Sequence, residues 1–282
     1  MKTGLVLEGG GLRDMFTAGI LDVMMEAGIR FDGIIGVSAG ATFGCNYKSH
    51  QRGRTLRYNL RMAGNWRYCS LRSWITTGDL VGAEFAYHTL PKELDVFDND
   101  TYRQDPTEFC VVCTDVETGH PVYHRIDTFD DEGLEWLRAS ASLPIVSRVV
   151  TVGGHCMLDG GISDSIPLAY WQAEGYTRNV VILTQPAGFR KKPSSLTPLF
   201  RIFCRRTPAI IEAMKRRHEM YNAELDYLRT QELAGNTLVL CPEQPLNIGR
   251  TEMDPAKMQR IYDDGVAYGR LHIDEIRRFV EE

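Results

Sequence analysis

The chain has 282 residues, of which 43% are hydrophobic and 24% charged, with a formal net charge of −5. This balance is that of a globular protein with a sizeable core, and it excludes a disordered chain and a collagen-like fibre. No stretch approaches the roughly 20 apolar residues that span a bilayer, and the start lacks the long apolar region of a secretory signal.

Short apolar runs and helical patterns alternate over the first sixty residues. Residues 3–8 are an apolar run, 12–28 carry a helical pattern that ends at Gly28, and 33–37 form a second apolar run before a helix of small residues. We expect the first run to be the first strand. Strands and helices alternating at this spacing predict a parallel sheet with helices on both faces.

The rest of the chain continues this alternation. Strands are predicted at 108–116, 121–126, 147–152, 179–184 and 236–241, and helices at 130–141, 207–233 and about 255–279. Residues 117–120 fit the turn of a hairpin over 108–126. With no internal repeat or low-complexity linker, we predict a single α/β domain over 1–282. Its part over 185–282 is expected to be mostly helical with one late strand.

Seven scattered cysteines, an odd number, are typical of reduced thiols, so we expect a cytoplasmic protein. Cys110 and Cys113 form a C-x-x-C pattern inside a predicted strand, where residues three apart face opposite ways. No second pair follows, which favours small core residues over a zinc site. We expect neither a metal nor a cofactor.

A G-x-S-x-G pattern lies where the second apolar run meets a helix, at Gly36-Val37-Ser38-Ala39-Gly40. A serine on a sharp strand-to-helix turn is exposed, and its neighbours must be small to let the backbone turn. The amino terminus of the following helix favours negative charge on a substrate oxygen. The pattern fits a plain turn with Ser38 as helix cap equally well.

Three successive glycines, Gly9, Gly10 and Gly11, follow the first apolar run. Glycine restricts the backbone least, so their N–H groups can converge on a phosphate or a tetrahedral oxyanion. A dinucleotide site would need G-x-G-x-x-G, but Asp14 occupies the third glycine position. The acid expected after the second strand is also missing, which disfavours that site.

Four blocks in order resemble the patatin-like phospholipases. They are Gly9-Gly10-Gly11-Leu12-Arg13, Gly36-Val37-Ser38-Ala39-Gly40, Arg138-Ala139-Ser140-Ala141-Ser142-Leu143-Pro144 and Asp159-Gly160-Gly161. The resemblance covers about residues 3–170, and the tail beyond 185 carries no matching block. It implies a three-layer α/β/α sandwich with a mostly parallel central sheet. It also implies hydrolysis of fatty-acyl esters, often of phospholipids, by a serine–aspartate dyad.

At the matching positions, the resemblance implies Ser38 as the nucleophile and Asp159 as the base that takes its proton. The other matching positions imply oxyanion-hole amides and one candidate substrate-binding cation: Gly9, Gly10, Gly11, Ala39 and Arg13. One position departs from the family pattern, because Asp14 stands where a glycine is usual. We expect its carboxylate to face outward and favour the first turn of a helix at 14–28.

Asp159 must be more basic than an ordinary carboxylate to accept a serine proton, so we expect burial to raise its pKa. Asp164, five residues later, is the other candidate. The glycine pair after Asp159 lets its loop approach the serine, which favours Asp159. Taken alone, Asp159-Gly160 is also a common hairpin turn.

An α/β-hydrolase would use the same serine pattern with a later acid and then a histidine. Ser38 follows a single strand–helix unit, which is too early for that fold. Downstream of the acid, His218 and His272 lie in charged helical patterns, and His155 is expected to make a local hydrogen bond. These positions favour a dyad without histidine.

Residues 189–218 contain nine Lys or Arg against one acid, Glu212. Apolar residues are interleaved with them, namely Leu196, Leu199, Phe200, Ile202 and Phe203. Such a mixture suits contact with an anionic membrane, on the inner face if the protein is cytoplasmic. A solvated helix face is the alternative, and nucleic acid is disfavoured because no basic-and-aromatic stacking pattern is present.

We therefore predict a lipid acyl-ester hydrolase. An acyltransferase or thioesterase with the same dyad remains an alternative, as does a non-catalytic lipid- or nucleotide-binding protein of the same fold. Head group, chain length and oligomeric state leave no signal in the sequence.

Overall fold

The computed structural model describes residues 1–195, 200 and 204–281. Within these residues an eight-stranded sheet has the order β5-β6-β3-β2-β1-β7-β8, with β4 paired to β3. The strands are β1 (Lys2–Leu7), β2 (Gly33–Val37), β3 (Glu108–Asp115), β4 (Pro121–Arg125), β5 (Val150–Val152), β6 (His155–Asp159), β7 (Tyr176–Ile182) and β8 (Thr237–Leu240).

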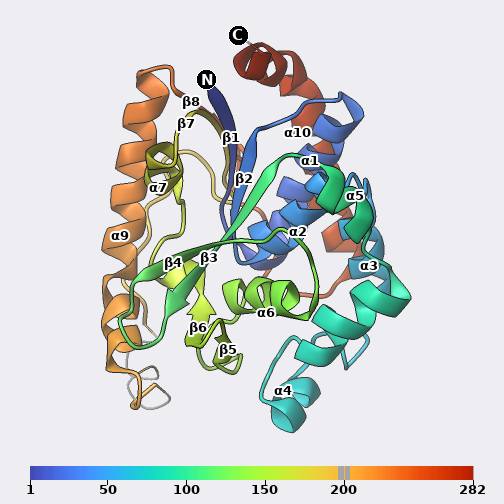
Figure 1. Ribbon diagram of the computed structural model, residues 1–282, viewed down its shortest axis with the longest axis vertical. Coiled ribbons are helices and arrows are strands. Elements are labelled where there is room, and N and C mark those ends of the chain that lie inside the picture. The colour runs from blue at the N-terminus through green and yellow to red at the C-terminus, as the bar shows by residue number, and fades with distance from the viewer. Residues whose placement is uncertain (196–199, 201–203, 282) are drawn as a thin grey trace.

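Helices on both faces of the sheet make three layers (Figure 1). They are α1 (Met15–Glu26), α2 (Ala39–Lys48), α3 (Arg54–Met62), α4 (Leu71–Thr77), α5 (Asn99–Gln104), α6 (Asp131–Ser140), α7 (Leu168–Ala173), α9 (Pro208–Leu233) and α10 (Pro255–Glu281). Short 3-10 turns η1 (Gly11–Asp14) and η3 (Gly160–Ile162) and the π-helical η2 (Phe85–Leu94) complete the set.

The central strands run parallel. β1 pairs in parallel with β2 and β7, β2 with β3, and β7 with β8. β4 and β6 run antiparallel to β3, and β5 runs antiparallel to β6. The predicted three-layer α/β/α sandwich with a mostly parallel sheet is confirmed, and so is the predicted hairpin.

Alternate residues of the central strands enter two different cores, because both faces of the sheet are covered. Leu5, Leu7 and Ile34 pack in the core under α1, α2 and α10. Val6 and Ile35 pack in the opposite core, with side chains of α7 and α9. Cys110 and Cys113 are buried in these two different cores, as predicted for small core residues.

The carboxy-terminal part of the chain packs directly on the amino-terminal part. α10 crosses α1 at glycines: a Cβ on Gly265 would lie 2.1 Å from the Phe16 carbonyl oxygen, and one on Gly19 2.3 Å from the Tyr262 carbonyl oxygen. That the whole chain forms one domain stays a prediction, which this packing and the addition of β8 to the sheet support. No helix in the described ranges is both long and apolar enough to cross a membrane.

Several elements differ from the sequence prediction, and two of them carry residues of the sequence motifs. The predicted helix over 12–28 begins with the 3-10 turn η1, and α1 starts only at Met15. β6 was not predicted, since its first residues, His155 and Cys156, lack the buried apolar character of the central strands. Asp159 ends this strand.

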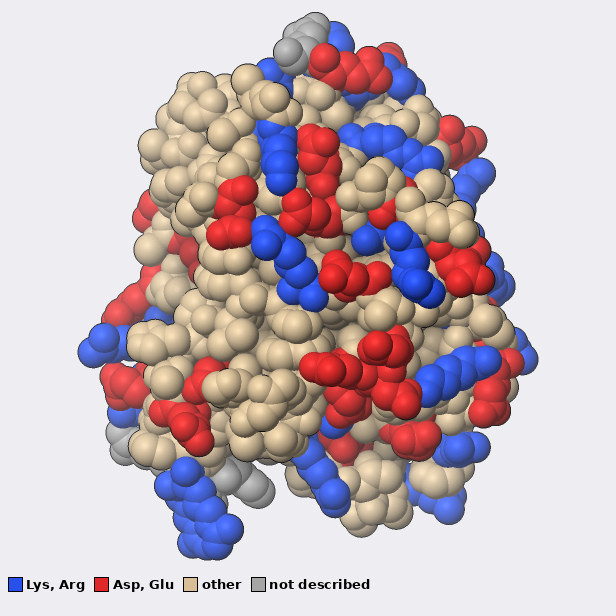
Figure 2. All heavy atoms as spheres, in the orientation of Figure 1, with Lys and Arg blue, Asp and Glu red and all other residues tan. Residues whose placement is uncertain are grey.

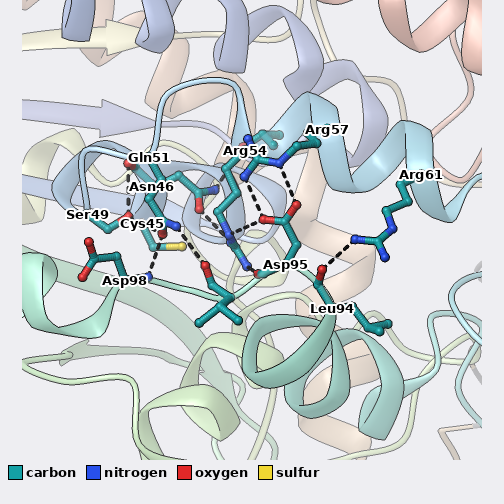
Figure 3. Close-up of polar contacts among 12 residues, drawn as sticks. Cys45, Asn46, Ser49, Gln51, Arg54, Arg57, Arg61, Leu94, Asp95 and Asp98 are labelled. Atoms are coloured by element: carbon teal, nitrogen blue, oxygen red, sulfur yellow. Dashed lines mark hydrogen bonds and ion pairs between the residues drawn. The ribbon is translucent and has the colours of Figure 1, made fainter.

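A buried ion pair connects the end of η2 to the start of α3 (Figure 3). The side chains of Arg54 and Asp95 are each 5% exposed, and Arg54 Nε lies 3.2 Å from Asp95 Oδ1. Arg54 Nη1 also donates to Asn46 Oδ1 at 2.8 Å. Arg57 donates to both carboxylate oxygens of Asp95, at 2.8 and 2.9 Å, from a largely exposed position.

We predict that Arg54→Ala lowers the free energy of unfolding by about 3 kcal/mol, because it removes the buried partner of Asp95 and leaves the buried Asn46 Oδ1 without its donor. Arg57→Ala is the matched control and should cost at most about 1 kcal/mol, since its guanidinium is half exposed. Urea unfolding of both variants tests this. Equal losses would contradict the assignment of the pair as a buried anchor.

Candidate active site

Ser38 lies on a tight turn between β2 and α2. Its φ and ψ are 56° and −124°, a strained conformation for a residue with a side chain. The turn needs small neighbours: a Cβ on Gly40 would lie 2.5 Å from the Glu8 carbonyl oxygen, and one on Gly36 2.6 Å from Ala41 Cα. The serine is thus presented above the carboxyl end of β2, half exposed.

The triple-glycine loop lies against this turn. A Cβ on Gly9 would lie 2.6 Å from the Val37 carbonyl oxygen and 2.8 Å from Ser38 Cβ. Gly11 has a φ of 63°, in the left-handed region that favours glycine. Among the described residues, none accepts a recorded hydrogen bond from the N–H of Gly9, Gly11 or Ala39.

Asp14 does not face outward as expected. Its side chain is fully buried and accepts a hydrogen bond from the N–H of Gly10 at 2.5 Å. The N–H of Gly10 is therefore committed to this carboxyl group instead of an oxyanion. Burial, and then the neighbouring Glu8, raise the pKa of Asp14 well above its usual value. Inward packing is favoured here because the side chain caps an amide that would otherwise lack a partner.

Asp159 ends β6 and is 2% exposed. Its Oδ1 accepts from the N–H of Gly161 at 2.8 Å, and its Oδ2 is buried with no hydrogen-bond partner of normal geometry among the described residues. Burial raises the pKa of Asp159, while hydrogen bonding from Ser38 and the charge of Arg217 act to lower it. Gly160 permits the turn, since a Cβ there would lie 2.1 Å from the Val112 carbonyl oxygen.

Ser38 and Asp159 line one pocket, whose cavity volume is about 160 Å³. Gly9, Gly10, Gly11 and Ala39 line it as well. Arg13 is not among the lining residues described, although the adjacent Leu12 is.

The alternative acid and the histidines lie elsewhere. Asp164 accepts a hydrogen bond from the hydroxyl of Tyr123 at 2.6 Å and does not line the pocket. No histidine is among the described lining residues. His155 lies 3.7 Å from Asp115, and His218 contacts the Lys215 carbonyl.

The alanine–serine block, which the sequence assigned no role, connects the two candidate catalytic residues. Ser140 Oγ accepts from the N–H of Ser38 at 3.0 Å and donates to the Val112 carbonyl oxygen at 2.7 Å. The carbonyl of Ser142 accepts from the N–H of Asp159 at 2.9 Å. One short segment therefore fixes the main chain at both Ser38 and Asp159.

A second, smaller chamber of about 90 Å³ adjoins the pocket. Both cavities are lined by Thr42, Phe43, Tyr68, Val81 and Tyr87. The other lining residues of this chamber are mostly apolar, apart from the ion-paired Arg54: Cys45, Tyr58, Ala86, Leu90, Pro91, Phe97, Phe129, Leu134 and Leu137. The segment over 49–107, for which the sequence predicted no element, supplies much of this wall.

Two pocket residues come from the tail that carries no motif. Arg217 on α9 and Arg250 in the loop before α10 line the pocket beside Ser38 and Asp159. Arg217 donates to the carbonyl of Gly161, and the Arg250 carbonyl accepts from the N–H of Leu12 at 3.0 Å. No sequence signal distinguishes these arginines from others in the tail.

A family model for patatin-like phospholipase matches residues 5–170, more than half of the chain. The chain belongs to the patatin-like phospholipase family. A second model, a domain of unknown function (DUF6363), matches residues 207–281. The family match contains Ser38 and Asp159, whereas Arg217 and Arg250 lie in the second match.

Similar proteins include a lysophospholipase, nte1, of Aspergillus oryzae, 25% identical over 98% of this chain and 18% of that protein. The uncharacterized protein YjjU of Escherichia coli is 30% identical over 66% of this chain and 53% of its own length. The chain thus spans only part of these relatives. VipD of Legionella pneumophila matches in structure with a TM-score of 0.48 and 13% identity, over 97% of this chain and 67% of that one.

We predict that Ser140→Ala destabilises the protein by about 1–3 kcal/mol, because it leaves the part-buried N–H of Ser38 without its acceptor and the buried Val112 carbonyl without the Ser140 donor. The same change should lower turnover of any substrate attacked by Ser38. Ser142→Ala is the control, since Ser142 contacts Asp159 through its main chain and its hydroxyl contacts only Arg138. Urea unfolding and ester turnover measure both; equal effects would refute the role of the Ser140 hydroxyl.

Proposed function

We propose that this chain is a serine acyl-ester hydrolase of lipids, with Ser38 as nucleophile and Asp159 as general base. The observation that carries the proposal is the common pocket of a serine on a strained turn, a buried carboxylate and unpaired main-chain amides. Family membership supports lipid esters as the substrate class. Its relatives' name, lysophospholipase, points the same way.

In the proposed reaction, Ser38 Oγ attacks the acyl carbon while Asp159 takes its proton. The raised pKa of Asp159 improves the match to the serine hydroxyl. The negative oxygen that forms is stabilised by the amides of Gly9, Gly11 and Ala39 and by the amino terminus of α2. Asp159 returns the proton to the leaving alkoxide. Water, deprotonated by Asp159, then hydrolyses the acyl-enzyme.

The apolar chamber next to the pocket fits the acyl chain of such a substrate. The chamber borders the pocket at Phe43 and Tyr87, which line both cavities. Burying one methylene group contributes about 0.8 kcal/mol, so a chain extending into the chamber gains much of its binding free energy there. We therefore expect long-chain esters to be preferred.

Labelling with a fluorophosphonate tests the nucleophile. Ser38→Ala should abolish labelling and hydrolysis of nitrophenyl esters, and Asp159→Asn should reduce both strongly, by about 100-fold or more for loss of a general base. Ser163→Ala is the matched control, because it removes a hydroxyl that contacts Thr114 and Ser163 does not line the pocket. Undiminished labelling of Ser38→Ala would refute the proposal and favour a non-catalytic lipid-binding protein.

Chain-length preference tests the chamber. Ala86 lines it, so Ala86→Phe should fill it and lower kcat/KM for nitrophenyl palmitate by about tenfold, the cost of roughly two buried methylene groups. Turnover of the butyrate ester should change much less. Ala173→Phe, at an exposed position on α7, is the control. A uniform loss on both esters would contradict the assignment of the chamber.

An acyltransferase or thioesterase would use the same dyad and differ only in what attacks the acyl-enzyme or leaves from it. Hydrolysis is favoured here by the lysophospholipase relatives alone. Product analysis with and without an added alcohol acceptor separates the two readings.

We further infer peripheral contact with an anionic membrane, at its cytoplasmic face. The cysteines are all free thiols, which agrees with a reducing compartment. Several cations of the stretch over 189–218 are used within the protein: Arg190 pairs with Asp226, and Lys215 and Arg216 pair with Glu212. Leu196, Leu199, Arg201, Ile202 and Phe203 lie outside the described residues.

The remaining exposed cations support this contact together with apolar side chains at the same end of the molecule. Arg205 and Arg206 are exposed and share a surface hollow with Val149, which is 42% exposed. On α4, Leu71 and Ile75 are 70% and 78% exposed. Figure 2 shows Lys and Arg side chains projecting at the lower end of this view, where Figure 1 places α4 and the start of α9.

Sedimentation with liposomes tests this contact. Arg205→Glu/Arg206→Glu should weaken binding to phosphatidylserine-containing vesicles by at least about tenfold, since each cation near such a surface contributes about 1 kcal/mol. Arg260→Glu/Arg270→Glu, on the exposed side of α10, should have little effect. Binding that is indifferent to phosphatidylserine would refute the proposal.

A further inference from the structure

Cations gather on the side of the pocket formed by the tail of the chain. Arg217 and Arg250 line the pocket itself. Arg13 and Lys191 lie near enough that, with Arg217, their charges act on one another and on Arg250. Three of these four residues lie outside the patatin-like match over residues 5–170.

The two lining arginines contact two different loops of the candidate site. Arg217 contacts the Asp159 loop, with its Nη2 only 3.2 Å from where a Cβ on Gly161 would lie. Arg250 contacts the glycine loop, with its Cα 3.0 Å from where a Cβ on Gly11 would lie. Both residues line the same pocket as Ser38, where a substrate ester would be held.

These cations lack the acidic partners that their neighbours in sequence have. Among the described residues, no carboxylate lies within ion-pair distance of Arg13, Lys191, Arg217 or Arg250. Arg13 Nε is buried with no hydrogen-bond partner. Glu8, whose charge acts on Lys191 and Arg250, accepts from the hydroxyl of Tyr221 at 2.6 Å and from Thr184.

The unpaired charges affect one another's protonation. Desolvation, then repulsion by Arg217 and Arg13, lower the pKa of Arg250, while attraction to Asp159 and Glu8 opposes this. Desolvation and Arg217 likewise lower the pKa of Lys191 to about 7, and its ammonium lies 3.9 Å from the centre of the Tyr221 ring. A bound anion would relieve this repulsion. Although its surroundings desolvate the guanidinium in part, Arg250 keeps solvent-exposed surface, so an anion can reach it.

We propose that Arg217 and Arg250 bind the phosphate of the substrate's head group and thereby select phospholipids over neutral acyl esters. This proposal rests on the proposed acyl-ester hydrolase function. Guanidinium groups match phosphate oxygens with paired hydrogen bonds. The acyl chain would enter the apolar chamber, and the head group would lie on the opposite, cationic side, with the ester between them at Ser38. The segment matching a domain of unknown function would then determine head-group specificity.

The test compares two substrates that share one ester, 1-oleoylglycerol 3-phosphate and 1-oleoylglycerol, each presented in neutral detergent micelles. The wild type should show a higher kcat/KM for the phosphate-bearing substrate. Arg250→Gln and Arg217→Gln should each lower the ratio of the two kcat/KM values by about tenfold or more, and Arg250→Lys should lower it less. Arg270→Gln, an exposed position on α10, should leave the ratio unchanged.

The ratio separates binding from positioning. Loss of Arg217 will also alter the pKa of Asp159, but this changes the pH profile of both substrates alike and cancels in the ratio. Equal losses on both substrates would mean that the arginines only position the two loops, and would overturn the proposal. Thermal unfolding of each variant checks that it is folded, and Arg250→Lys supplies a measurement if a Gln variant is not.

Inorganic phosphate distinguishes a head group from a free anion. It should inhibit turnover of 1-oleoylglycerol competitively, and more weakly in Arg250→Gln. If phosphate inhibits but the wild type shows no preference for the phosphate-bearing lipid, the cations bind a free anion and not a head group. That result would overturn the head-group proposal. A wild type that hydrolyses neither lipid and is not labelled at Ser38 would refute the hydrolase function itself, a result distinct from a ratio near one.

Discussion

The site depends on the close approach of two main-chain turns at the carboxyl ends of β1 and β2. These strands are parallel neighbours in the centre of the sheet, so their turns emerge side by side. Glycines at Gly9 and Gly40 let the two turns touch, since a Cβ at either position would lie within 2.6 Å of a carbonyl oxygen of the other turn. This contact holds Ser38 in its strained conformation and sets the glycine amides beside it.

The acid reaches this contact by a different route. β6 pairs antiparallel with the end of β3, the strand on the other side of β2, and so carries Asp159 to the edge where Ser38 stands. Ser140 and Ser142 then fix the main chain at both residues. The relative position of serine and acid is therefore determined by three neighbouring strands and one short segment, all of them within the patatin-like match.

Local pattern was sufficient for β1, β2 and the turn at Ser38. The apolar runs at 3–8 and 33–37 became β1 and β2, and the small residues around Ser38 predicted a turn that the structure contains. What pattern could not predict depends on distant partners. β6 begins with half-exposed polar positions and is a strand only because β3 and β5 pair with it. The sequence pattern of the basic stretch over 189–218 predicts a single cationic surface. In the structure its described cations instead pair with acids, lie in solvent or line the pocket.

Asp14 illustrates the same limit at a single residue. Its place at the start of a helix predicted an outward carboxylate, because an isolated helix end stabilises an acid exposed to water. In the folded chain the Gly10 amide faces inward, and an unpaired buried N–H costs about 1–3 kcal/mol. The Asp14 carboxyl group removes that cost, and its own burial is eased by a raised pKa. The loop is thereby held by a side chain at its middle glycine, while Gly9 and Gly11 on either side line the pocket and their amides have no acceptor among the described residues.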